Sequence, residues 1–407
     1  MGKPFEDSDD VTSGEARESR LHILVIPTAY PCFHSPIDGI YVQEQACAVQ
    51  STGARVGVVY PDLRSWRTLN AGQFTKCLFQ TTTDSEDGIN VIRVQGWNVP
   101  LGKLGPRLWR ILAMRLLATY IKRFGRPDLC HAHNAIWAGT VAREAKKRFG
   151  IPYVLTEHST AYRRNLFRAY QERLTREVFS DAFEVIAVSK GLRSDLQRFI
   201  QDREIRVIPN MVNVDYFSLP ETPIEEKPFR FLSVSMLTQR KGIDILIRAF
   251  HRAFSEREDI VLEVAGEGPE RGDLEELTRD LKIADRVCFS GLLTREQVRE
   301  TMWRSNVFVL ASHIETFGVV LIEALATGLP VIATRCGGPE DFVDDEVGFL
   351  VEPGNVSALA QVLKQAWAER SRFNKYRLRE YASQNFSSVA VSKEICDTYR
   401  RVRCNQK

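Results

Sequence analysis

The sequence predicts an α/β protein of two domains, each built on a doubly wound parallel sheet. Three observations support this fold class. The chain has 407 residues, which is more than a single hydrophobic core usually serves. Short apolar runs alternate with helical patterns in both halves, as is typical of parallel sheets with crossover helices. Residues 214–228 contain three prolines and several acids, so they predict a linker between the halves.

The first half contains six apolar runs that predict strands. The first of them, Leu-His-Ile-Leu-Val-Ile, precedes a polar loop with a glycine, after which a helix is expected. We expect a first domain at residues 21–213, preceded by a flexible polar tail at residues 1–20. The predicted strands are residues 21–26, 54–60, 128–133, 153–156, 182–188 and 205–208, and the clearest helices are residues 39–51 and 138–149.

The second half repeats this alternation. It predicts a second domain at residues 229–385 and a last helix within residues 386–407, with a ligand cleft between the two domains. The predicted strands are residues 229–234, 260–265, 287–290, 307–310 and 331–333, and the predicted helices include residues 243–254 and 319–327.

Composition indicates an ordinary globular protein, with 26% charged and 44% hydrophobic residues. No run approaches the roughly 20 apolar residues of a membrane span, and the first 20 residues lack the apolar region of a signal peptide. The eight cysteines include no C-x-x-C pair, which argues against a zinc site and for free thiols in a reducing compartment. We therefore expect a cytoplasmic protein. Residues 21–215 carry 26 Lys and Arg against 17 Asp and Glu, whereas residues 216–407 carry 26 against 29.

The segment from Ser312 to Gly338 carries the strongest functional signal. Glu315 precedes a predicted helix, and Glu323 is expected about two turns inside it. The helix start would lie at the carboxyl edge of a parallel sheet, where backbone N–H groups and the helix dipole attract a phosphate or diphosphate. A carboxylate accepts two hydroxyl protons well, as on a ribose or sugar ring. The same acids also suit a solvated helix surface. The amides expected to face a phosphate are those of Thr316, Phe317 and Gly318.

This segment resembles the signature of glycosyltransferase family 4, the retaining nucleotide-sugar transferases of GT-B fold. The shared pattern is Glu, seven residues, Glu, a helix of small residues, Gly-x-Pro-Val and a Gly-Gly turn. The resemblance implies two Rossmann-like domains facing each other across a cleft, with a C-terminal helix that returns to the first domain. It also implies that Glu315 contacts the transferred sugar and Glu323 contacts the ribose of the nucleotide.

Two cations follow the first predicted strand of the second half. Arg240 and Lys241 could neutralise a leaving diphosphate without a metal ion, although a solvated loop is the alternative. The family usually has an Arg five residues before this Lys, where this chain has Met236. We therefore expect Lys241 to be catalytic and Arg240 to supply the missing charge.

Two glycines in the loop after residues 260–265 resemble the family's Gly-x-Gly-Pro turn on the nucleotide side. Gly266 and Gly268 are thus expected near the donor, with a plain tight turn as the alternative. The sequence is not G-x-G-x-x-G, so it gives weak support for a dinucleotide enzyme.

Two histidines alternate on one predicted strand and so point to the same face of the sheet. His131 and His133 could form a metal pair, but no acidic or cysteine cluster accompanies them, and no metal site is predicted. The resemblance implies that His133 reaches the sugar. His158, in Thr-Glu-His, is similar to another loop of this half and is expected near the acceptor, with a structural role as the alternative.

Two further loops resemble family motifs. Gly39 is expected to let the backbone approach the donor phosphate, and Asp38 is expected to meet the acceptor. Residues 208–215 are similar to an interdomain Pro-Asn-Gly-Val-Asp motif, with Met211 in place of Gly.

A basic run lies between Gly88 and Pro127, with eight Lys and Arg and no acids. Cations interleaved with Leu, Trp and Ile predict an amphipathic helix that contacts an anionic membrane surface through residues 93–126. A domain helix with a solvated basic face is the alternative. Arg163, Arg164 and Arg168 could extend either surface.

Together these features predict a metal-independent, retaining hexosyltransferase without a cofactor. Its donor would be a UDP- or GDP-sugar, and its acceptor a glycan or lipid-linked hydroxyl in polysaccharide synthesis, at the inner membrane face. The alternatives are a GT-B nucleotide-sugar epimerase, a GT-B phosphorylase, and a basic module that binds lipid or nucleic acid. The last leaves the Glu315 segment unexplained, and no nucleic-acid partner is expected.

Overall fold

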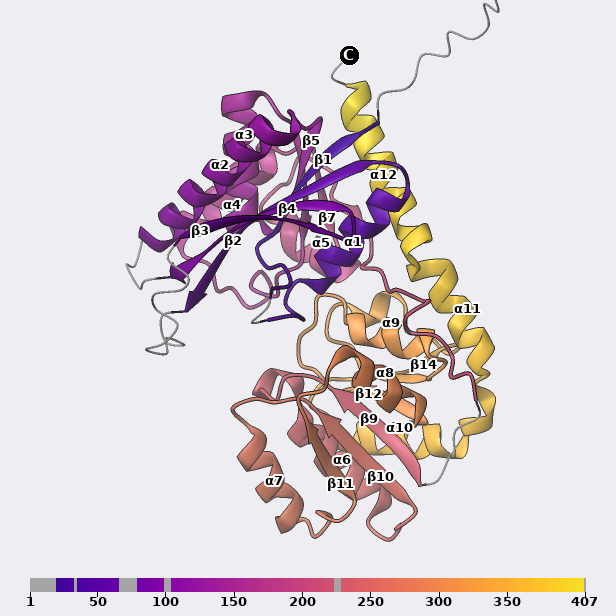
Figure 1. Cartoon of the computed structure of the whole chain (residues 1–407). Coiled ribbons are helices and arrows are strands. Elements are labelled where there is room, and N and C mark those ends of the chain that lie inside the picture. Colours follow the sequence, from indigo (N-terminus) through magenta and orange to yellow (C-terminus); the bar gives the residue numbers. More distant parts are fainter. Residues whose placement is uncertain (1–19, 33–34, 66–78, 99–103, 223–227, 406–407) are drawn as a thin grey trace, which may run out of the picture.

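The computed structural model describes residues 20–32, 35–65, 79–98, 104–222 and 228–405. They form two α/β lobes, each with its own sheet, and a long C-terminal helix lies along the first lobe (Figure 1). This is the predicted fold class. The predicted tail, residues 1–20, lies outside the described residues except for Arg20, as does part of the predicted linker.

The first lobe contains an eight-stranded sheet of order β3-β4-β2-β1-β5-β6-β7-β8, in which only the β3–β4 pair is antiparallel. All five residues of β1, β5 and β6 are buried, because helices cover both faces of a parallel sheet. The strands are β1 (His22–Ile26), β2 (Arg55–Ser65), β3 (Gln80–Glu86), β4 (Ile89–Asn98), β5 (Leu129–His133), β6 (Tyr153–Glu157), β7 (Glu184–Ala187) and β8 (Arg206–Val207). The helices are α1 (Ile40–Ser51), α2 (Leu104–Phe124), α3 (Thr140–Phe149), α4 (Ala169–Asp181) and α5 (Lys190–Gln197), with a π-helical turn at Asn134–Gly139.

The second lobe contains a six-stranded sheet of order β11-β10-β9-β12-β13-β14, parallel throughout. Some of its helices begin at side-chain caps, such as Thr294 before α8 and Asn355 before α10. The strands are β9 (Phe229–Val234), β10 (Ile260–Ala265), β11 (Val287–Gly291), β12 (Val307–Leu310), β13 (Val331–Thr334) and β14 (Gly348–Val351). The helices are α6 (Ile243–Phe254), α7 (Arg271–Asp280), α8 (Arg295–Trp303), α9 (Val319–Ala326), α10 (Val356–Ala368), α11 (Lys375–Phe386) and α12 (Ser388–Cys404).

The last two helices lie against different lobes. Helix α11 packs on α9 of the second lobe, and α12 packs on α1 of the first (Figure 1). Val391, Ile395 and Tyr399 of α12 are buried in the core that contains Val42 and Val49 of α1. Ser387, between α11 and α12, has an extended backbone, and its hydroxyl accepts a hydrogen bond from the Ala390 N–H at the start of α12. The chain therefore crosses back to the first lobe after completing the second.

Helix α2 covers β2 and β4 with its apolar side. Trp109 and Leu112 are buried there, whereas Arg110 and Arg115 are exposed. The apolar side of this predicted membrane-surface helix is therefore occupied by the sheet, and only its basic side faces outward. Arg93, the first residue of the predicted surface, is buried in an ion pair within the first sheet and does not belong to it.

Candidate active site between the two lobes

Each of the two sheets has a point at which its strand order reverses. In the first sheet β1 lies between β2 and β5, and in the second β9 lies between β10 and β12. Ligands of doubly wound sheets bind outside the carboxyl ends of the strands at such points. Four residues singled out from the sequence follow or end these strands: Gly39 after β1, His133 in β5, Lys241 after β9 and Glu315 after β12.

Lys241 and Glu315 form an ion pair at the carboxyl edge of the second sheet. Lys241 Nζ lies 2.5 Å from Glu315 Oε1, which also accepts a hydrogen bond of 2.8 Å from Ser312 Oγ. Both charged side chains are mostly buried, at 17% and 13% exposure. Gly242 permits this pairing because a Cβ there would lie 2.3 Å from the carbonyl oxygen of Ala311. The loops after β9 and β12 therefore pack together and hold a cation beside a carboxylate.

The start of α9 presents amide groups beside this pair. The N–H groups of Thr316, Phe317 and Gly318 donate no hydrogen bond within the part of the chain that the structure describes. The Phe317 side chain is buried against Phe342 and Phe386, so only its backbone can face a ligand. These amides and the positive end of the helix dipole would attract an anion.

Glu323 lies little more than one turn inside α9, because the helix begins only at Val319. The expectation of two turns was wrong in this respect. Burial raises the pKa of Glu323 to about 8, while the guanidinium of Arg295 lowers it and the carboxylate of Glu44 raises it. Arg295 of α8 and Glu44 of α1 form an ion pair between the lobes.

Arg240 and Lys241 face different surroundings although they are adjacent. Arg240 is partly buried and lines a cavity of the first lobe, and its Nε has no hydrogen-bond partner among the described residues. Met236, which stands where an Arg was expected, is 64% exposed. A cation on the first-lobe side of the cleft is therefore supplied by Arg240.

Gly266 and Gly268 allow two loops of the second lobe to touch. A Cβ at Gly266 would lie 1.8 Å from the carbonyl oxygen of Ser235, and one at Gly268 would lie 2.2 Å from that of Leu237. Gly266 also has a φ of +136°, which side chains rarely adopt. These contacts give both glycines a packing role within the second lobe.

Burial favours the neutral form of His133, and one of its ring nitrogens is unpaired in the part of the chain that the structure describes. Its Nδ1 lies 3.0 Å from His158 Nε2, and its buried Nε2 has no partner among the described residues. Burial, His131 and His158 together hold the pKa of His133 well below its usual value. His131 shares the same face of the sheet, as predicted, but its two nitrogens bond Tyr399 and Thr156 at 2.6 and 2.7 Å.

A cavity of about 490 Å³ lies at the carboxyl edge of the first sheet. His158 lines it and packs against Tyr41, with ring centroids 4.6 Å apart. Glu157 at its wall is fully buried and accepts hydrogen bonds from three backbone amides and one tyrosine hydroxyl. The lining combines aromatic and neutral polar side chains, including Tyr41, Asn134, Trp137, Thr160, Phe167 and Gln171, with Arg240 reaching in from the second lobe.

Gly39 is buried with a φ of +73°, and a Cβ there would lie 2.1 Å from the carbonyl oxygen of Ala29. Contact within the first lobe therefore explains this glycine. Asp38, beside it, is exposed.

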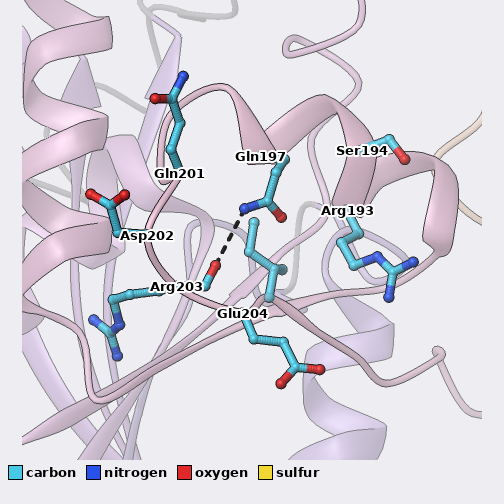
Figure 2. A pocket seen from close by; sticks show the side chains of 8 residues that line it. Arg193, Ser194, Gln197, Gln201, Asp202, Arg203 and Glu204 are labelled. Carbon is cyan, nitrogen blue, oxygen red and sulfur yellow. Dashed lines mark hydrogen bonds between the residues drawn. The ribbon is translucent and has the colours of Figure 1, made fainter.

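A larger cavity, of about 730 Å³, is lined by eight residues of the first lobe (Figure 2). Its walls are the end of α5 and residues 201–205, which precede β8 and so lie at the amino-terminal edge of the sheet. Gln197 spans it with a hydrogen bond of 3.3 Å to the carbonyl oxygen of Arg203. Its position, opposite to the carboxyl ends of the strands, separates it from the residues described above.

Neither a metal cluster nor a membrane span occurs among the described residues. No group of three or more His, Cys, Asp or Glu there is arranged to hold a metal ion. No helix of that part of the chain is long and apolar enough to cross a membrane.

The residues that join the lobes were missed by sequence reasoning. Arg163 donates a hydrogen bond of 2.9 Å to the carbonyl oxygen of Cys336, and the Glu44–Arg295 pair joins α1 to α8. The sequence indicated Arg163 only as one of several cations in a loop. No local pattern indicates such contacts, because they depend on how the two lobes lie against each other.

Two family models match consecutive parts of the chain. Residues 39–216 match glycosyltransferase family 4, and residues 217–385 match the glycosyl transferases of group 1. Together these matches include every residue of the candidate site except Asp38.

The sequence relatives are glycosyltransferases. A putative teichuronic acid biosynthesis glycosyltransferase of Bacillus subtilis is 27% identical over 84% of this chain and 88% of its own length. A glycosyltransferase of Methanocaldococcus jannaschii is 28% identical over 77% of this chain and 85% of its own. The gpi3 subunit of phosphatidylinositol N-acetylglucosaminyltransferase from Schizosaccharomyces pombe is 28% identical over 51% of this chain, and the match spans only 46% of that protein.

Solved structures share the fold. Sucrose-phosphate synthase from Thermosynechococcus elongatus has a TM-score of 0.76 at 21% identity, and the match covers 94% of this chain and all of that one. HepE of Anabaena, in complex with UDP and glucose, has a TM-score of 0.69 at 20% identity, covering 93% of this chain and all of that one. The chain is therefore a glycosyltransferase of the GT-B fold that is similar to glycosyltransferase family 4.

Proposed function

We propose that this glycosyltransferase moves a hexose, with retention of configuration and without a metal ion, from a UDP- or GDP-sugar to an acceptor hydroxyl. The observation that carries the proposal is the Lys241–Glu315 pair beside the amides at the start of α9, which donate no hydrogen bond among the described residues. In the proposal, the Nε2 of His133, which has no partner in that part of the chain, faces this pair from the first lobe. A cation and amide groups suit a diphosphate, and carboxylates with a neutral imidazole suit sugar hydroxyls.

In this proposal the second lobe binds the donor. Lys241 and Arg240 neutralise the diphosphate as it leaves, so that protein cations do what a metal ion does in other transferases. Glu323 accepts hydrogen bonds from the ribose, and Glu315 contacts the transferred sugar together with His133. The amides of residues 316–318 contact the phosphates, and the loop of Gly266 and Gly268 shapes the nucleotide side.

The first lobe binds the acceptor in the cavity lined by Tyr41, His158 and Trp137, with Asp38 near its entrance. The acceptor hydroxyl attacks on the face that the diphosphate leaves, and a phosphate oxygen of the leaving group takes its proton. This route therefore requires no general base from the protein. Gly39 orders the backbone next to the phosphates.

The acceptor in this proposal is a growing glycan or a lipid-linked glycan of polysaccharide synthesis. Names of two relatives support this class, since one concerns teichuronic acid and the other phosphatidylinositol. The outer side of α2 supports contact with an anionic membrane, because it exposes Arg107, Arg110, Arg115, Lys122 and Arg123. The cytoplasmic face of a membrane, where anionic lipids lie, is the place this surface suits. Lys103, expected to belong to it, lies outside the described residues.

A donor screen tests the proposal. The purified chain is incubated with UDP-glucose, UDP-N-acetylglucosamine and GDP-mannose, with and without octyl glycosides, in the presence of EDTA. We expect one donor to release its nucleotide, faster with an acceptor, and the anomeric proton signals of the product to show retention. No nucleotide release from any donor would contradict the proposal, and formation of an epimerised sugar without an acceptor would favour an epimerase.

A further inference from the structure

Arg163 connects the acceptor side of the cleft to the donor side. It lies in the loop that follows β6, and its Nε is 3.0 Å from Asp195 Oδ2 of α5, in the same lobe. Its Nη1 donates a hydrogen bond of 2.9 Å to the carbonyl oxygen of Cys336, in the other lobe. Asp195 therefore orients the guanidinium toward the turn that follows β13.

The carbonyl group that Arg163 contacts also orders the Glu315 loop. The Cys336 oxygen accepts a second hydrogen bond, of 3.1 Å, from the backbone N–H of Glu315. Glu315 in turn holds Lys241 through its carboxylate. One acceptor atom thus joins a first-lobe cation to the backbone of the residue proposed to contact the sugar.

Two glycines make this contact close. A Cβ at Gly337 would lie 1.9 Å from Arg163 Nη1, and a Cβ at Gly191 would lie 1.9 Å from the carbonyl oxygen of Gly337. The backbone N–H of Lys190 donates a hydrogen bond of 2.5 Å to Asp341 Oδ2 beside them. The two lobes therefore touch at the Gly-Gly turn, with no room for side chains.

The loop of Arg163 also forms the wall of the proposed acceptor cavity. Ala161 and Tyr162, directly before Arg163, line that cavity together with His158. The Tyr162 hydroxyl donates a hydrogen bond of 2.8 Å to the buried Glu157 carboxylate. A short, tethered segment therefore contacts the acceptor cavity at one end and the donor loop at the other.

We propose that Arg163 is a positioning residue that places the Glu315 backbone when the two lobes are closed and couples this placement to the acceptor cavity. The proposal rests on the proposed function for what Glu315 does. Arg163 does not touch the reacting atoms. Its ion pair with Asp195 is partly exposed, at 32% and 23%, and such pairs add little to folding stability. Its replacement should therefore alter the site more than the fold.

Steady-state kinetics with the donor from the screen test this role. In Arg163→Ala we expect kcat to fall about 10- to 100-fold, because small displacements of a positioned group cost rate of this order. The donor KM should stay within about threefold, since the diphosphate contacts remain. Arg163→Lys should recover part of kcat, as an ammonium group can still donate to the Cys336 carbonyl. Arg164→Ala, an exposed neighbour, serves as the matched control and should keep the wild-type kcat.

A second measurement does not need activity. Cys336 is 3% exposed beneath this contact, and burial raises its pKa to about 12, so its alkylation should be slow. The rate of iodoacetamide labelling at Cys336, read by mass spectrometry, should rise several-fold in Arg163→Ala. Cys396, buried between α12 and α1, gives the internal reference.

The outcomes separate the two proposals. A kcat that falls equally in Arg163→Ala and Arg164→Ala, or an unchanged labelling rate at Cys336 in Arg163→Ala, would overturn the positioning role. If the wild-type chain releases no nucleotide from any donor, the proposed function fails. The labelling rate then still decides whether Arg163 holds the turn.

Discussion

The two sides of the cleft use different chemistry at equivalent places in their sheets. At the switch point of the second sheet, the loops carry an ion pair between Lys241 and Glu315, and the carboxyl group of Glu323, whose pKa is raised, lies inside α9. At the switch point of the first sheet, β5 ends in His133, whose pKa is held well below its usual value. The adjoining cavity is lined mostly by aromatic and neutral polar groups, with Glu157 buried in its wall and Arg240 reaching in from the second lobe. The same fold thus offers one face suited to a charged diphosphate and another suited to a neutral polyhydroxy group.

The difference also extends to how each side is ordered. The charged side is held by backbone contacts between loops, at Gly242, Gly266 and Gly268. The neutral side is held by buried hydrogen bonds, as at Glu157 and His131. Substitutions on the two sides should therefore affect different kinetic constants, and the predictions below test this in order of expected size.

The largest effect is expected for Lys241→Ala. Loss of this cation should lower kcat about 100- to 1000-fold, because one charge that stabilises the leaving diphosphate is removed and Glu315 loses its partner. Initial rates at a saturating concentration of the sugar donor measure it. Arg248→Ala, an exposed cation on α6, is the control and should keep kcat within about twofold. A full-rate Lys241→Ala enzyme would show that the charged side does not act on the leaving group.

Much of this arrangement could be predicted from the sequence. The alternation of apolar runs and helical patterns predicted most of the parallel strands, and the ends of those strands located Lys241, Glu315 and His133. Strand β3 was not predicted, because its sequence, Gln-Thr-Thr-Thr-Asp-Ser-Glu, is polar and mostly exposed on the edge of the sheet. Edge strands bury too little to show an apolar alternation.

The rest of the site depends on tertiary contacts. Gly39 was expected to approach a phosphate, and the structure adds a contact with the Ala29 backbone that no local pattern indicated. Arg163 and the Glu44–Arg295 pair join segments that are far apart in the chain, so no local pattern could indicate them. The sequence also left undecided whether the apolar side of α2 contacts the sheet or a membrane, because an apolar surface suits both.

A smaller effect is expected on nucleotide affinity, which should depend on pH through the ionisation of Glu323. Because its pKa is raised to about 8, its carboxyl is mostly protonated at pH 7, and only the ionised form accepts two ribose hydroxyls. Affinity for UDP or GDP should therefore increase about tenfold from pH 7 to pH 9, as the binding-competent form becomes populated. Calorimetric titration measures it. Glu323→Gln should abolish the dependence, and an affinity that is flat with pH in the wild type would contradict the role.

In the cavity of the first lobe, Trp137→Ala is expected to raise the KM of the acceptor. Stacking of an aromatic ring contributes about 0.5–1.5 kcal/mol beyond its buried area, so the acceptor KM should rise several-fold while the donor KM stays unchanged. Trp137→Tyr should restore most of the affinity. Tyr376→Ala, an exposed aromatic residue on α11, is the control, and thermal unfolding shows whether each variant is folded. An equal rise in both KM values would mean that the two sides are not separate.

The smallest effect is expected on the outer side of α2, which belongs to the first lobe but lies away from its cavity. Each cation near an anionic lipid surface contributes about 1 kcal/mol, so Arg110→Ala should weaken binding to phosphatidylglycerol vesicles about fivefold. Vesicle sedimentation at low and high salt measures it, with phosphatidylcholine vesicles as the neutral reference. Arg377→Ala, whose side chain on α11 is 82% exposed, should bind like the wild type. Because the apolar side of α2 is covered by β2 and β4, binding should disappear at high salt; binding that resists salt would require that side to leave the sheet.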